Sequence, residues 1–171
     1  MAEISIIMAS NRSKNFLGLL DNLEATAAVP SRLEVFIKID EEDTKMQTEL
    51  KGCEVGRPFK VTVFVSPRLN GIYSLHIGYR ALFKLVPTDC YFIFNPSDEY
   101  RFLTKGWDDI LLSYRHMYPD DIFRLKSSVN HNRAHNTFLE CLPYPDNFPF
   151  YTRKWLELVE GFGNVEGPDT W

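Results

Sequence analysis

A chain of 171 residues, 44% hydrophobic and 14% aromatic, can bury one sizeable core, so its composition excludes a disordered chain and favours a single domain. Its formal net charge is -4, from 19 Lys and Arg against 23 Asp and Glu. A mildly acidic chain has no general electrostatic attraction to nucleic acid or to an anionic membrane, although a local basic pocket for a phosphate stays compatible with that charge.

The first half of the chain alternates apolar runs with an amphipathic pattern. Residues 4–10, "ISIIMAS", form a near-continuous apolar run that is typical of a strand buried on both faces. Residues 15–27 repeat apolar side chains at helical spacing and predict a helix. Residues 32–40 and the Val-rich, alternating residues 59–66 predict a second and a third strand.

The second half continues the alternation. Helical spacing is found over 71–86, 106–118 and 151–163, and strand-like runs over 90–95 and 121–129. Residues 130–150, rich in Asn, His and Pro, are typical of a long loop. Strands that alternate with helices predict an α/β domain with a mostly parallel sheet flanked by helices.

The ends of the chain and its cysteines bear on the compartment. Cys53, Cys90 and Cys141 lie far apart without a CxxC pair, which indicates free thiols in a reducing compartment. The start, "MAEISIIMAS", has an acid at residue 3 and a short apolar run, so it is neither a signal peptide nor a membrane span. We expect a cytoplasmic protein without a transmembrane segment. The chain stops at "GPDTW" without an obvious closing element, so a chain truncated at its C-terminus is one expectation.

In parallel α/β sheets, ligands collect at the carboxyl ends of the strands, and three segments fall there. They are residues 9–12, 38–43 and 95–100. Asp98 and Glu99 follow the fourth predicted strand, where hard carboxylate oxygens suit Mg²⁺ or Mn²⁺. The alternative is an exposed turn, since Asn-Pro-Ser-Asp is ordinary turn chemistry.

The other two segments offer a carboxylate and a cation. Asp40 leads an acidic run that ends the second strand and could accept hydrogen bonds from a base or ribose, although acidic runs are usually solvated. Ser10, Asn11 and Arg12 follow the first strand, and Arg12 could hold a phosphate by paired hydrogen bonds. Arg68 precedes a predicted helix and is either a second phosphate contact or a surface cation.

Other patterns are weaker. The sequence contains neither GxGxxG nor GxxxxGK[ST], so the two common phosphate-binding fingerprints are absent. His131 and His135 have i,i+4 spacing without an evident third metal ligand, which favours surface loop residues. Asp169 is a lone carboxylate that could act as a general base near a sugar hydroxyl.

In order and spacing the chain resembles the inverting nucleotide-sugar glycosyltransferases of the GT-A fold, the family-2-like group. The segments that carry the resemblance are "ISIIMASNR", "FIKIDEED", "PRLNGIYSLHIGYRAL", "FIFNPSDEYRFLTKGWDD" and "YTRKWLELVEGFGNVEGPDTW". The resemblance implies a metal-dependent transfer of a sugar, with inversion, from a UDP- or GDP-type nucleotide-diphosphate sugar to a glycan or other hydroxyl acceptor.

The resemblance also implies roles for particular residues. Those expected to bind the nucleotide-sugar are Ala9, Ser10, Asn11, Arg12, Asp40, Arg68, Ser97 and Asp98. Asp98, with Glu99 beside it, would take the metal-binding position of the family's DxD motif. Trp107 and Asp108 would lie on the acceptor side. Asp169 would be the catalytic base.

Two departures from the family pattern leave an alternative open. Pro96 stands where the first acid of the DxD motif would be, and Pro168 stands where the Glu of the family's Glu-Asp motif would be. The alternative is a noncatalytic GT-A-like module that binds a nucleotide, a glycan or a protein. A nucleotidyltransferase on a related fold would need a glycine-rich phosphate loop near the N-terminus, which "MASNRSKNFLG" matches poorly.

Overall fold

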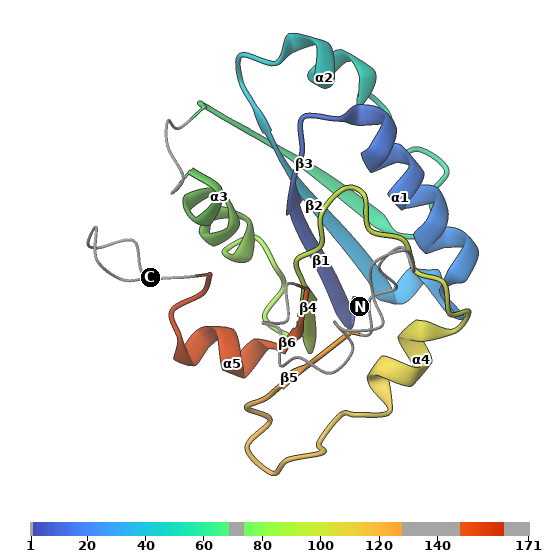
Figure 1. Cartoon of the computed structure of the whole chain (residues 1–171), viewed down its shortest axis with the longest axis vertical. Helices are drawn as coiled ribbons and strands as arrows, with labels where there is room; N and C mark the ends of the chain where they lie inside the picture. Colours follow the sequence, from blue (N-terminus) through green and yellow to red (C-terminus); the bar gives the residue numbers. More distant parts are fainter. Residues whose placement is uncertain (1, 69–73, 128–147, 163–171) are drawn as a thin grey trace, which may run out of the picture.

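The computed structural model describes residues 2–68, 74–127 and 148–162 (Figure 1). In chain order the elements are β1 (Ile4–Ala9), α1 (Ser13–Thr26), a short 3-10 turn (Pro30–Arg32), β2 (Leu33–Asp40), α2 (Thr44–Glu49), β3 (Lys60–Ser66), α3 (Ser74–Phe83), β4 (Phe92–Phe94), α4 (Trp107–Leu112), β5 (Arg124–Leu125), β6 (Phe150–Thr152) and α5 (Arg153–Leu158).

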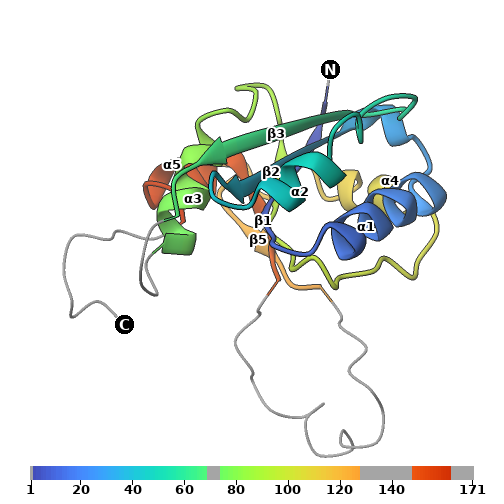
Figure 2. The ribbon, with the colours of Figure 1, turned by 90° about the horizontal axis from the view of Figure 1, so that it is seen from above.

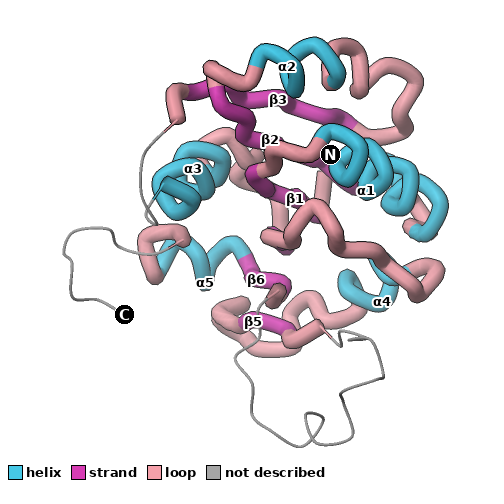
Figure 3. Tube along the Cα trace, turned by 45° about the horizontal axis from the view of Figure 1, so that its top comes forward, coloured by secondary structure: helices cyan, strands magenta, loops and turns pink. Residues whose placement is uncertain are grey.

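The strands form one mixed sheet in the order β3-β2-β1-β4-β6-β5. The pairs β3–β2, β2–β1 and β1–β4 are parallel, and β6 runs antiparallel to both β4 and β5. Ile4 of β1 lies opposite Leu33 on one side and Phe92 on the other, so β1 lies between β2 and β4 in the parallel part of the sheet. Figure 3 shows β2 between β1 and β3.

Helices cover both faces of the sheet. In Figure 2, α1, α2 and α4 lie to one side and α3 and α5 to the other. Phe16, Leu19, Leu20 and Leu23 of α1, spaced at three and four residues, are fully buried in the larger core. Leu82 of α3 and Leu156 of α5 belong to a second core on the opposite face. The predicted α/β class, with a mostly parallel sheet flanked by helices, is confirmed.

Several elements differ from the sequence prediction. The helix predicted over 106–118 is only Trp107–Leu112, and the strand predicted over 121–129 is only Arg124–Leu125. The acidic run after β2 leads into the short helix α2, because the Asp43 side chain caps it by accepting from the Met46 N–H at 2.9 Å. The predicted helix over 151–163 begins at Arg153, because residues 150–152 pair with β4 as strand β6. Sequence pattern did not reveal β6, since its partner is far away in the chain.

Cys53 and Cys90 are free thiols, as predicted, and Cys141 lies outside the described residues. Within the described ranges, no helix is long and apolar enough to cross a membrane.

Candidate functional site

The topology creates a switch point between β1 and β4. From β1 the chain builds outward through β2 to β3, and then returns to place β4 on the other side of β1. In α/β sheets this is where the loops at the carboxyl ends diverge and leave a crevice for a ligand. Two predicted site residues meet there: the Ser10 hydroxyl donates to Asp98 Oδ2 at 2.5 Å, across 88 positions of sequence.

A second group lies at the carboxyl end of β2. Residues 38 and 40 project from the same face of the strand, and the ammonium of Lys38 forms an ion pair with Asp40 Oδ1. The Arg68 Nε lies 3.2 Å from Asp40 Oδ2. Asp40 is therefore a carboxylate held between two cations, with its side chain 24% exposed.

Ser10 of the first group and all three residues of the second group line one pocket of about 260 Å³. Its walls are Ala9, Ser10 and Asn11 after β1, Lys38 and Asp40 of β2, Arg68 after β3, and Leu75 and Gly78 of α3. Five of the predicted nucleotide-sugar residues line it, namely Ala9, Ser10, Asn11, Asp40 and Arg68. Asp98 adjoins the pocket through its contact with Ser10.

The pocket contains residues that the sequence analysis missed. Lys38 could have been found, because it precedes Asp40 by two positions in a strand and must share its face. Gly78 lies next to it, since a Cβ built there would be 3.7 Å from Lys38 Cγ. Leu75 and Gly78 could not have been found, because the packing of α3 against β1 and β2 brings them to the pocket.

Tyr79 and Asn95 form hydrogen bonds that connect β1 with β4 near the switch point. Asn95 donates from Nδ2 to the Ile7 carbonyl at 2.9 Å and so ties β4 to β1. Burial raises the pKa of the Tyr79 phenol, while its hydrogen bonds with the Asn95 side chain and the Ala9 backbone act in the opposite direction. The negative charge of Asp98 adds a smaller contribution to the rise in that pKa.

Glu99 faces a different partner from Asp98. It forms an ion pair with Arg12, and both side chains are more than half exposed, at 66% and 60%. An exposed pair of this kind contributes little to stability and exchanges readily. Ser97 is exposed, and its carbonyl accepts from the Tyr100 N–H at 3.1 Å in the turn that carries both acids.

The sequence predicts a divalent metal ion at Asp98 and Glu99, and the residues around these two acids show what kind of metal site they could form. Among the described residues, no group of three or more His, Cys, Asp and Glu is placed to hold a metal ion. Mg²⁺ is usually held by one or two carboxylates together with substrate phosphates. The donor set at the switch point, a carboxylate and a hydroxyl beside a pocket, fits a cation shared with a phosphate ligand rather than an all-protein cage.

Trp107 and Asp108 lie away from the pocket. Asp108 is fully buried, and its two oxygens accept from the N–H groups of Ala28 at 2.6 Å and Val29 at 2.9 Å. The Trp107 indole stacks on Phe102, with ring centroids 4.0 Å apart. Trp107 Nε1 donates to the hydroxyl of Thr26, the last residue of α1, at 3.2 Å, and the partners of Asp108 follow directly after that helix. These contacts lie about 20 Å along the helix from Ser10 at 1.5 Å per residue. Their positions give no support to the acceptor role predicted for them.

Asp169, which the resemblance makes the catalytic base, lies outside the described residues, as do His131 and His135, which the sequence analysis interprets as surface loop residues.

The structure resembles solved structures of transferases, although no similarity was found at the level of sequence families. No family model matches the chain, and no curated protein matches it. Among solved structures, the mannosyltransferase PcManGT from Pyrobaculum calidifontis, in complex with GDP-Man and Mn²⁺, superposes over 94% of this chain with a TM-score of 0.75 and 12% identity. S. aureus TarS 1-349 superposes over 97% with a TM-score of 0.56 and 12% identity.

The fold is of the GT-A type. A cytidylyltransferase from Leptospira borgpetersenii is also similar, over 96% of this chain, with a TM-score of 0.54 and 14% identity. The chain spans 47% of the mannosyltransferase, 51% of the TarS chain and 66% of the cytidylyltransferase. At these identities the similarity establishes the nucleotide-diphospho-sugar transferase fold, and function has to be argued from the site.

Proposed function

We propose that the protein is a metal-dependent, inverting glycosyltransferase of the family-2-like group that uses a nucleotide-diphosphate sugar. One observation carries the proposal. Ser10 and Asp98 meet at the switch point of a GT-A fold, beside a pocket in which Asp40 is held between two cations. Such a pocket offers a carboxylate for a base at one end and an acid for a phosphate-bound cation at the other.

The order of charges around Asp40 favours uracil as the base. The Asp40 carboxylate is a hydrogen-bond acceptor that lies between two donors, the ammonium of Lys38 and the guanidinium of Arg68. Uracil presents the complement: a carbonyl oxygen, the N3–H donor and a second carbonyl oxygen. Guanine would set its amino group against one of the cations, and cytosine would set a ring lone pair against the carboxylate. A base that sets a donor against a cation, or a lone pair against the carboxylate, loses a hydrogen bond in the complex, so we expect UDP to bind more tightly than GDP, and GDP more tightly than CDP.

The residues of the site have distinct parts in the proposed reaction. Asp98 would hold a divalent cation, Mn²⁺ or Mg²⁺, which when bound offsets the negative charge of the leaving diphosphate. Arg12 is an exposed cation near the pocket and would hold phosphate oxygens, whereas Arg68, which pairs with Asp40, would contact the base. Asp169 would take the proton of the acceptor hydroxyl as it attacks the anomeric carbon from the opposite face. Ser97, in the same turn as Asp98, would contact the nucleotide-sugar.

The noncatalytic module remains the second candidate, because Pro96 and Pro168 replace two acids of the family pattern. Hydrolysis of the nucleotide-sugar separates the two. A slow, Mn²⁺-dependent release of nucleoside diphosphate from a UDP-sugar supports the enzyme. Tight binding without release supports the module.

The proposal is tested by nucleotide binding. Melting temperature is measured with UDP, GDP or CDP, each with and without Mn²⁺. We expect the largest rise with UDP and Mn²⁺, a loss of the preference for UDP in Asp40→Asn, and a loss of the Mn²⁺ effect in Asp98→Asn. Asp109→Asn is the matched control, because this exposed carboxylate pairs with Arg32 at the far end of α1. If no nucleoside diphosphate raises the melting temperature, the proposed function is wrong.

A further inference from the structure

The acidic turn after β4 offers a single carboxylate toward the pocket. Asp98 contacts Ser10 of the pocket wall, whereas Glu99 forms its ion pair with Arg12. The residue two positions before Asp98 is Pro96, which has no side-chain donor. A cation at Asp98 would therefore need a further protein oxygen from another segment, or would rely on the diphosphate alone.

The Ser10 hydroxyl is placed to be that oxygen. Its Oγ lies 2.5 Å from Asp98 Oδ2 and accepts a hydrogen bond from the Arg12 N–H at 2.9 Å. A hydroxyl oxygen has two lone pairs, so one remains after the Arg12 contact. The Ser10 backbone N–H in turn donates to the Lys38 carbonyl at 3.4 Å, which fixes the loop to β2. The hydroxyl is thus oriented by backbone contacts and is half-buried at the pocket wall.

The spacing and chemistry of the two oxygens suit one edge of a hard-cation site. Mg²⁺ binds oxygens at about 2.0–2.1 Å in octahedral geometry, so neighbouring ligands are about 3 Å apart. Opening the Ser10–Asp98 contact by about half an ångström would meet that requirement. A neutral serine or threonine hydroxyl holds Mg²⁺ in the same way in P-loop nucleotide sites.

We propose that Ser10 Oγ is the second protein ligand of the cation, taking the place that an acid at residue 96 would have. The inference rests on the proposed function, because the cation is retained jointly with a nucleoside diphosphate. Loop β1–α1 and the turn after β4 then form one metal site across the switch point. With this arrangement the cation has two protein ligands, Ser10 and Asp98, although residue 96 is a proline.

The test exchanges a hard ligand for a soft one. Isothermal titration calorimetry measures UDP affinity without metal, with Mn²⁺ and with Cd²⁺, so the readout does not depend on turnover. We expect Ser10→Ala to reduce the Mn²⁺-dependent gain in UDP affinity, taken for each variant as the ratio of its affinities with and without Mn²⁺, by about tenfold or more. Ser10→Cys loses the gain with Mn²⁺ and recovers it with Cd²⁺, because a thiolate prefers soft cations. Ser10→Thr keeps the hydroxyl and most of the gain.

Ser13→Cys is the matched control. The Ser13 hydroxyl also bonds a carboxylate, that of Glu49, but neither residue is part of the pocket. This variant should behave as the wild-type protein with both metals. Urea midpoints of all variants show whether any loss reflects unfolding, and the comparison of Mn²⁺ with Cd²⁺ in Ser10→Cys keeps the test decisive if Ser10→Ala is unstable.

The outcomes separate the two proposals. If Mn²⁺ raises UDP affinity, Asp98→Asn removes the rise, and Ser10→Ala and Ser10→Cys both keep it, the Ser10 inference is wrong and the proposed function stands. If the wild-type protein binds UDP equally with and without Mn²⁺, the inference fails together with the metal dependence. Rescue of Ser10→Cys by Cd²⁺, but not of Ser13→Cys, supports the inference.

Discussion

The Asn22 side chain of α1 forms two hydrogen bonds with the backbone of Phe102, although the residues are 80 positions apart. Its Nδ2 donates to the Phe102 carbonyl at 3.0 Å, and its Oδ1 accepts from the Phe102 N–H at 2.7 Å. The segment 98–108 follows α1 along its length, from Ser10–Asp98 at one end to Ala28–Asp108 at the other. The acid of the candidate site is therefore positioned by α1 as well as by β4.

Replacing Asn22 by Leu should destabilise the protein. The substitution removes both hydrogen bonds and leaves the Phe102 N–H and C=O, which are part-buried, without their partner. We expect the free energy of unfolding to fall by about 1–3 kcal/mol, measured by urea denaturation. Lys14→Ala, at an exposed position of the same helix, should change it by less than about 0.5 kcal/mol. Equal stability of the two variants would contradict a fastening role for Asn22.

The neighbouring acids Asp108 and Asp109 should respond differently to the same change. Asp108→Asn places an amide donor against one of two backbone N–H groups at a fully buried position, and should cost about 1–3 kcal/mol of unfolding free energy. Asp109→Asn affects a mostly exposed ion pair with Arg32, and should cost less than about 1 kcal/mol. Chemical denaturation of both variants at pH 7 makes the comparison, and a similar loss in both would refute it.

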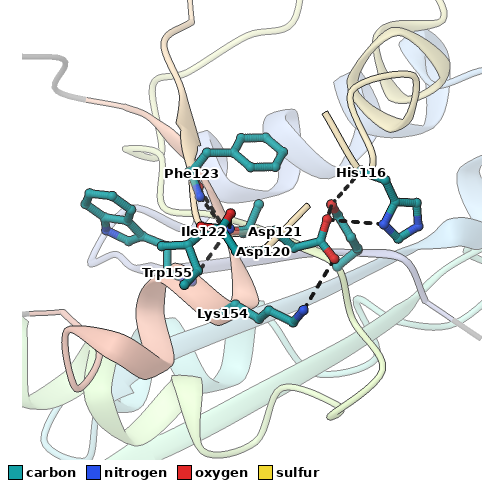
Figure 4. A network of polar contacts seen from close by, with 9 residues as sticks. His116, Asp120, Asp121, Ile122, Phe123, Lys154 and Trp155 are labelled. Carbon is teal, nitrogen blue, oxygen red and sulfur yellow. Dashed lines mark hydrogen bonds and ion pairs between the residues drawn. The ribbon is translucent and has the colours of Figure 1, made fainter. Parts of the chain in front are cut away.

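A polar network joins Asp121 to three other segments (Figure 4). The Tyr91 hydroxyl donates to Asp121 Oδ1 at 2.5 Å, His116 Nδ1 lies 3.2 Å from the same oxygen, and Lys154 Nζ lies 3.4 Å from Oδ2. The hydrogen bond from Tyr91, followed by the charges of His116 and Lys154, lowers the pKa of Asp121, and partial burial acts against it. The network holds the turn after α4 against α5.

This network should weaken in acid. Because the pKa of Asp121 is lower in the folded state, its ionised form contributes stability above the ordinary Asp value of 3.8, and that contribution is lost as the pH falls through the folded-state pKa. Asp121→Asn should therefore be less stable than wild type at pH 6, and the difference should shrink below about pH 4. Urea midpoints between pH 3 and pH 6 measure it. A difference that is constant over this range would exclude the linkage to Asp121.

The two described cysteines should differ in reactivity. Cys90 is buried and therefore inaccessible, and its burial also raises the pKa of the thiol to about 11, so the thiol stays protonated at pH 8. Burial also raises the pKa of Cys53, but that side chain is only half-buried. With iodoacetamide we expect Cys53 to be alkylated first and Cys90 only after addition of urea, followed by mass spectrometry of peptides. Alkylation of native Cys90 at the rate of Cys53 would show that the thiol is exposed.

Much of the fold could be predicted from local patterns. The apolar run of β1 and the spacing of Phe16, Leu19, Leu20 and Leu23 in α1 are consequences of burial on both faces of a strand and on one face of a helix. The placement of Ser10, Asp40 and Asp98 at strand ends followed from the same patterns, because parallel strands present their carboxyl ends at one edge.

Local sequence patterns therefore predict the class of the fold and the edge of the sheet on which the polar residues lie. Which of those residues meet depends on how the elements pack in three dimensions. Register and strand order bring Ser10 to Asp98 and set Asp40 between Lys38 and Arg68, while Asp108, in a segment with the same polar appearance, is buried against the end of α1. These contacts join residues that local periodicity does not relate, because they depend on how α1, α3 and β4 pack around β1.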